Sequence, residues 1–153
     1  MNSNTIINYT FRWILILTIQ VLVLKRMDMM GGWFYYMNIM LYPILIIILP
    51  LRISTIAVMA IGFLTGLYID MFYDSLGVHA SACVFLGFAR GIVLAIISPR
   101  EGYNVSYSPT IHQFGLIWFL RYCSILMALF LFFYFSMEAF TFYYILDLSL
   151  IHI

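Results

Sequence analysis

The sequence contains little charge. Among 153 residues there are 7 Lys and Arg and 6 Asp and Glu, so charged side chains make up 8% of the chain and the net charge is +1. This excludes a basic surface for nucleic acid and an acidic interaction tail. The chain also lacks CxxC, HExxH, a phosphate-binding glycine loop and GxSxG. No motif of a soluble enzyme therefore supports an activity.

Cysteine is scarce as well. Cys83 and Cys123 are the two cysteines, and each lies inside an apolar run. Thiols in such surroundings behave as small apolar side chains. We interpret both as packing residues, and we expect no disulfide, metal site or cofactor.

Apolar residues dominate what is present. The chain is 65% hydrophobic and 19% aromatic, more than one globular core of this length can bury. We predict an all-α, polytopic membrane helical bundle that forms a single integral membrane domain over residues 1–153. Five apolar runs have the length of membrane spans, and a partial sixth follows. The predicted spans are 9–24, 33–49, 54–73, 78–97 and 114–136, with a partial span at 140–153.

Two of these runs carry specific expectations. Pro43 lies inside the second run and predicts a kink or a break there. The last run has 14 residues, about 21 Å of helix, which is shorter than a hydrocarbon core of about 30 Å. We therefore expect the sixth span to be incomplete and the recorded sequence to be truncated at its C-terminus.

Basic residues predict the orientation. With the N-terminus in the cytoplasm, the cytoplasmic side holds five basic residues and the opposite side holds two, and the reverse orientation inverts this count. The five are Arg12, Arg52, Arg90, Arg100 and Arg121, and the two are Lys25 and Arg26. We predict a cytoplasmic N-terminus.

Two rows of small or acidic residues recur every four positions in the third and fourth runs. Residues four apart share a broad helix face, and small residues let two membrane helices approach closely. One interpretation is a tightly packed hairpin of the two spans; the other is that one row docks a partner helix. The first row is Gly62, Gly66, Asp70 and Asp74, and the second is Cys83, Gly87, Gly91 and Ala95.

Ionisable side chains inside these runs are the candidate site. An ionisable group within a membrane span is by default a functional hypothesis. Asp70 and Arg90 lie in the third and fourth spans, where a direct ion pair is doubtful because the axial gap is about 14 Å. Asp74 is interpreted as a cap of the fourth span or a site residue, and His79 as an interfacial histidine or a site residue. The predicted helix-packing or partner interface is Gly62, Gly66, Asp70, Asp74, His79, Gly87, Arg90 and Gly91.

The pattern resembles the rod shape-determining protein MreD family of bacteria. The resemblance covers most of the chain, from the first predicted span to Phe140. It rests on Tyr42-Pro43 with the aliphatic run to Leu49-Pro50, GFLTGLYID from Gly62 to Asp70, LGVHA from Leu76 to Ala80, Arg90, SPREGY from Ser98 to Tyr103, and MEAF from Met137 to Phe140.

The resemblance implies a non-enzymatic scaffold of the cell-wall elongation machinery in the bacterial inner membrane. Its implied partners are MreC, and through it MreB and a class B penicillin-binding protein, besides membrane lipid. The family is also similar in architecture to the S-components of energy-coupling-factor transporters, which gives a substrate-binding transporter subunit as the alternative. A third hypothesis is an intramembrane enzyme, for which His79 with Ser75 or Ser81 is the local candidate.

Overall fold

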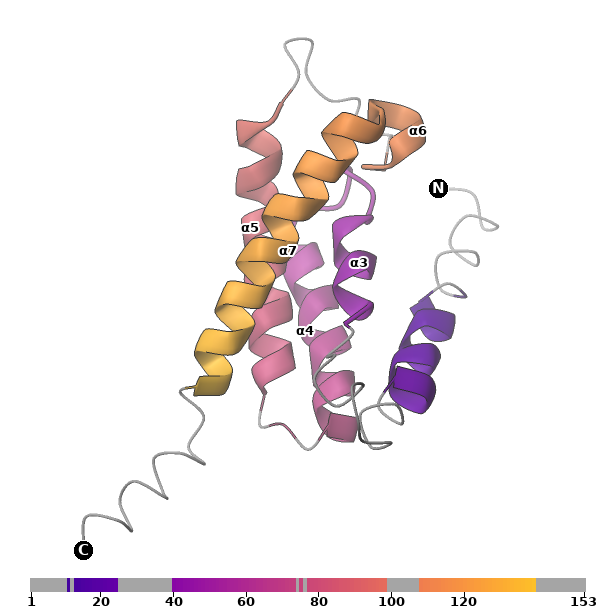
Figure 1. The fold of residues 1–153 in the computed structure, drawn as a ribbon, viewed down its shortest axis with the longest axis vertical. Coiled ribbons are helices and arrows are strands. Elements are labelled where there is room, and N and C mark those ends of the chain that lie inside the picture. Colours follow the sequence, from indigo (N-terminus) through magenta and orange to yellow (C-terminus); the bar gives the residue numbers. More distant parts are fainter. Residues whose placement is uncertain are drawn as a thin grey trace, which may run out of the picture. The chain divides into compact units, whose positions relative to one another are not determined.

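A computed structural model describes residues 11, 13–24, 40–73, 75, 77–98 and 108–139 of the chain (Figure 1). The chain divides into two compact units, Met1–Leu45 and Ile46–Ile153. Each unit is considered by itself below. A single membrane domain over all 153 residues stays a prediction.

The first unit contains an interrupted helical path. An apolar helix, Trp13–Leu22, runs into the π-helix η1, Gln20–Leu24, and the short helix α3, Tyr42–Ile47, begins at the end of the unit. The buried Gln20 side chain accepts a hydrogen bond from the backbone N–H of Leu41, at 2.8 Å. The carboxamide thus satisfies a backbone amide just before α3, where no helical partner exists.

The break expected at Pro43 is confirmed. Pro43 lies in the first turn of α3, where a missing N–H costs no helical hydrogen bond, and residues 40 and 41 before it are not helical. The predicted second span, 33–49, is therefore not one continuous helix in its described part. Its first seven positions, 33–39, lie outside the described residues.

Three long apolar helices build the second unit. They are α4, Thr55–Tyr73; α5, Val78–Ile96; and α7, Leu116–Ala139, and a four-residue helix, α6, Ile111–Phe114, precedes α7. Each long helix is long and apolar enough to cross a membrane. The all-α prediction is thereby confirmed for the described residues, which contain no strand, and the three long helices support the prediction of a membrane protein.

The span count is a correction. The predicted spans 54–73, 78–97 and 114–136 correspond to α4, α5 and α7, with shifts of at most three residues. Five spans and a partial sixth are not supported, because three helices of sufficient length are found among the described residues. The count came from apolar runs alone, and Pro43 interrupts one of them. Most of the first span is described as a shorter helix, and the partial span 140–153 lies outside the described residues.

Helix α5 lies between α4 and α7 in the second unit (Figure 1). The glycines at the α4–α5 interface permit very close approach. A Cβ atom added to Gly62 would lie 2.8 Å from the Cys83 carbonyl oxygen, and one added to Gly66 would lie 2.4 Å from the Ala80 Cα. Real Cβ atoms do not approach backbone atoms this closely, so these positions require glycine.

The second small-residue row faces the same interface. A Cβ atom on Gly87 would lie 3.1 Å from the Met59 Cα, and one on Gly91 would lie 3.3 Å from the Thr55 hydroxyl oxygen. Both rows are thus used by the α4–α5 hairpin. This supports the hairpin interpretation for the four glycines of the two rows.

The Cβ distances predict different losses of stability when different glycines are replaced. We expect Gly66→Ala to destabilise the hairpin most, by about 1–3 kcal/mol, because the added methyl group meets backbone atoms that cannot move independently. Gly91→Ala should cost much less, since it meets the end of a threonine side chain. Unfolding of the purified protein in detergent measures the order. Ala60→Val, at an exposed position of α4, is the control. Equal losses for Gly66→Ala and Gly91→Ala would contradict the interface.

Candidate functional site

The charged side chains described in the second unit are separated by sign. Arg52 in the α3–α4 turn, Arg90 in α5 and Arg121 in α7 lie toward one end of the helices. Asp70 near the end of α4 and Glu138 near the end of α7 lie toward the other. Arg121 and Glu138 are about 26 Å apart along the helix axis, close to the thickness of a hydrocarbon core. The candidate site therefore consists of two polar clusters at opposite ends.

The first cluster surrounds the Asp70 carboxylate, which is 5% exposed. One carboxylate oxygen, Oδ1, accepts from the backbone N–H of His79 at 3.0 Å, and Oδ2 accepts from that of Ala80 at 2.9 Å. Ser75 donates its hydroxyl proton to Oδ1. A buried anion held by two amides and a hydroxyl is well satisfied without a cation.

These contacts make Asp70 the cap of the next helix. His79 and Ala80 are the second and third residues of α5, the positions whose free N–H groups a capping side chain normally satisfies. The residue that precedes α5 is Gly77, which has φ +81° and no side chain to offer. Asp70 takes its place from the preceding helix, and the positive end of the α5 dipole further stabilises its charge.

His79 completes this cluster. Its ring is buried and lies against two tyrosine rings, with centroids 5.4 Å from Tyr73 and 5.1 Å from Tyr134. It therefore belongs to the packed interior of α4, α5 and α7. Asp74, the residue that the sequence predicted as a cap of this helix, lies outside the described residues.

The second cluster surrounds the Arg90 guanidinium, which is 4% exposed. Nη2 donates to the carbonyl oxygens of Leu49 and Pro50, and Nε donates to the Tyr122 hydroxyl oxygen at 3.1 Å. Tyr122 in turn donates to the carbonyl oxygen of Ile47 at 3.0 Å. Arg90 and Tyr122 thus bind carbonyl groups of the last residue of α3 and of the turn that follows it, where helical partners are missing.

Tyr122 was not among the residues predicted from the sequence. It is fully buried, and its ring stacks on that of Trp118 with centroids 5.1 Å apart. Trp118 donates its indole N–H to the carbonyl oxygen of Ile97, just past the end of α5. The available signal was weak, because the chain has 12 tyrosines and tyrosine is common at membrane interfaces.

Asp70 and Arg90 do not pair with each other. Asp70 binds the N-terminus of α5 and Arg90 binds the α3–α4 connection, at the opposite end of α4. The doubt about a direct ion pair is therefore supported. Among the described residues, no buried side-chain nitrogen or oxygen lacks a hydrogen-bond partner.

The structure does not assemble a nucleophile from the serines near His79. Ser75 donates its one hydroxyl proton to Asp70, and Ser81 donates its own to the carbonyl oxygen of Val78 at 2.9 Å. Neither hydroxyl group therefore donates to His79, the base with which the enzyme hypothesis paired these serines. The described residues also bring together no three His, Cys, Asp or Glu side chains that could hold a metal ion.

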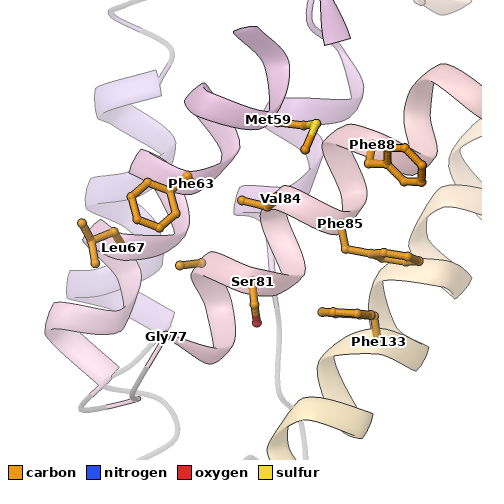
Figure 2. A pocket seen from close by; sticks show the side chains of 10 residues that line it. Met59, Phe63, Leu67, Gly77, Ser81, Val84, Phe85, Phe88 and Phe133 are labelled. Carbon is orange, nitrogen blue, oxygen red and sulfur yellow. The ribbon is translucent and has the colours of Figure 1, made fainter. Parts of the chain in front are cut away.

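An open apolar groove runs along α5 between α4 and α7 (Figure 2). Its volume is about 580 Å³, and its floor has small side chains near Gly77 and larger ones toward Phe88. On the α7 side, the rings of Phe85 and Phe133 stack with centroids 4.3 Å apart. Ser81 contributes the hydroxyl group among otherwise apolar side chains. The lining is Met59, Phe63, Leu67, Gly77, Ala80, Ser81, Val84, Phe85, Phe88 and Phe133.

Comparisons of the chain with protein-family models, curated proteins and solved structures found no match.

The capping geometry of Asp70 predicts a loss of stability on its replacement. We expect Asp70→Asn to destabilise the protein by about 1–3 kcal/mol, because an amide has one acceptor oxygen for three donors. Ser75→Ala removes one donor and should cost less. Unfolding in detergent is the measurement. If Asp70→Asn were as stable as the parent protein, the carboxylate would not be the cap.

A double-mutant cycle tests the second cluster. Arg90→Met and Tyr122→Phe should each destabilise the protein by about 1–3 kcal/mol, because each strands a buried carbonyl. The pair should cost less than the sum, since the two side chains also bind each other. Arg90→Lys should recover part of the loss, because an ammonium can still donate. Additive losses would show that the two side chains act independently.

Proposed function

We propose that this chain is a non-enzymatic scaffold of the bacterial cell-wall elongation machinery, similar to the rod shape-determining MreD family. The protein lies in the inner membrane, where it binds MreC and, through it, MreB and a class B penicillin-binding protein. The support is the resemblance of the motifs around Gly62–Asp70, Leu76–Ala80 and Arg90, and the use that the structure makes of these residues.

One observation carries the proposal beyond resemblance. The buried charged groups of the helices bind the chain's own backbone: Asp70 holds two amides of α5, and Arg90 holds two carbonyls beyond α3. Groups that are occupied in this way are available neither for proton transfer nor for ligand binding without local unfolding. Their function is to fix the geometry of the helices, as a scaffold requires.

The groove supports the same choice over the transporter alternative. A pocket for a small polar metabolite needs several convergent polar groups. The groove on α5 offers the Ser81 hydroxyl, which already donates within its own helix. The polar residues at the nearby end of the hairpin, Asp70 and His79, are buried beside the helix termini. No specific feature of the described residues favours a metabolite site.

The proposal includes an orientation. The arginine end of α4, α5 and α7 faces the cytoplasm, and the Asp70–Glu138 end faces the periplasm, because basic residues remain on the cytoplasmic side. A cytoplasmic N-terminus, expected from the distribution of basic residues in the sequence, belongs to the same proposal. Further spans from residues 1–39 and 140–153 would complete a polytopic architecture similar to that of transporter S-components.

Co-purification tests the function. The tagged chain, produced in rod-shaped bacteria in place of their own MreD, is extracted in mild detergent. We expect MreC and a class B penicillin-binding protein to be recovered with it by immunoblot, and the cells to remain rods. Gly66→Leu, which separates α4 from α5, should abolish recovery and give round cells.

A leucine substitution at an exposed position of α4 is the control for this experiment. Ala60→Leu adds the same side chain at an exposed position of the same helix and should preserve both recovery and rod shape. Recovery of an ATPase-bearing transporter module in place of MreC would support the alternative function. If MreC were not recovered with the unsubstituted chain, although that chain is present in the membrane at normal levels, the proposal would be contradicted.

A further inference from the structure

The arginine end of the second unit carries positive charge that no described residue there neutralises. Arg90 is buried, and its hydrogen-bond partners are two carbonyl groups and a hydroxyl group, none of them charged. A cation in low-dielectric surroundings is poorly screened, so its field extends to the adjacent surface. The described residues at this end contain no carboxylate, since Asp70 and Glu138 lie at the other end.

Two further guanidinium groups are exposed at the same end. Arg121 immediately precedes Tyr122, whose hydroxyl accepts from Arg90. Arg52 lies two residues after Pro50, whose carbonyl accepts from Arg90. Both side chains are exposed. The contacts of Arg90 therefore bring Arg52 and Arg121 to one level of the helices, and three positive charges lie close to one membrane boundary.

The aromatic side chains beside them mark that boundary. Trp118 lies one helical turn before Arg121 and is half-buried, with its ring between those of Phe114 and Tyr122. Tryptophan prefers the headgroup level of a bilayer, and arginine side chains extend toward the same level. A position at which basic and aromatic side chains meet favours contact with lipid phosphate.

We propose that this end of the protein binds anionic phospholipid headgroups, with Arg52 and Arg121 as the contacting residues and Arg90 as a buried source of positive potential. Negatively charged headgroups provide the counter-charge that the described residues lack. Arginine suits this role because its planar guanidinium can donate two hydrogen bonds to one phosphate. Zwitterionic lipids satisfy the hydrogen bonds without balancing the charge.

Quenching of Trp118 by brominated lipids tests the proposal. Trp13→Phe and Trp33→Phe leave Trp118 as the one tryptophan of the full chain, which is reconstituted in vesicles with brominated phosphatidylglycerol or brominated phosphatidylcholine. We expect the anionic lipid to quench more strongly at equal mole fraction. An electrostatic contribution of about 1 kcal/mol per arginine means that each arginine raises the preference for anionic over zwitterionic lipid by roughly fivefold. Raising the salt concentration should reduce the preference.

Matched variants assign the preference to residues. Arg121→Gln and Arg52→Gln should each lower it by roughly fivefold. Arg121→Lys should retain most of it, and Glu138→Gln, at the opposite end, should leave it unchanged. The emission maximum of Trp118 reports whether each variant keeps the local fold.

Three results would overturn the proposal. Equal quenching by the two lipids would show that no anionic preference exists. A preference that survived both glutamine substitutions would place it elsewhere on the protein. Abolition by inorganic phosphate at constant ionic strength would indicate a site for a soluble anion and not for a lipid headgroup.

Discussion

The structure depends on one constraint: polar groups inside the helices must find partners within the chain, because a hydrocarbon environment supplies none. Asp70 and Arg90 meet this constraint in complementary ways. The carboxylate accepts from two amides at the start of α5, and the guanidinium donates to two carbonyls beyond α3. Each charge thus binds backbone groups near a helix end, and each backbone segment stabilises a charge that would otherwise be costly to bury.

The glycine contacts make the Asp70 cap possible. The Gly66 backbone lies against Ala80, so the end of α4 and the start of α5 are close enough for a short aspartate side chain to reach amides of the next helix. A larger residue at position 66 would separate the two backbones and withdraw the carboxylate from its donors. Close packing and charge satisfaction in this hairpin are therefore coupled, because a change in one alters the other.

Much of this hairpin was predictable from the sequence. The runs 54–73 and 78–97 were correctly identified as helices, because apolar length determines them and Gly77 ends the connection between them. The four-residue spacing of the glycines predicted the contact face. The partners of the ionisable groups were not predictable, since the sequence indicated Asp74, four residues before α5, as a cap and gave no sign that Asp70 reaches its amides. Tyr122 became recognisable only when the fold placed its hydroxyl group between Arg90 and Ile47. The five-and-a-half-span count is supported only for its three long helices, because hydropathy does not detect a helix that begins at Tyr42.

The distribution of polar contacts limits how such a protein can recognise a partner. With Asp70 and Arg90 engaged inside, the membrane-facing surface of α4, α5 and α7 offers mainly apolar side chains, including Phe63 and Phe88, which are 47% and 51% exposed. Association within the membrane then rests on shape, because lipid tails are as apolar as these side chains and give no hydrophobic driving force. Charge can add specificity only at the helix ends, where arginine lies at one boundary and Glu138 at the other. The scaffold function that we propose would therefore depend on the shape of this apolar surface, with charge at the helix ends selecting the orientation of a partner.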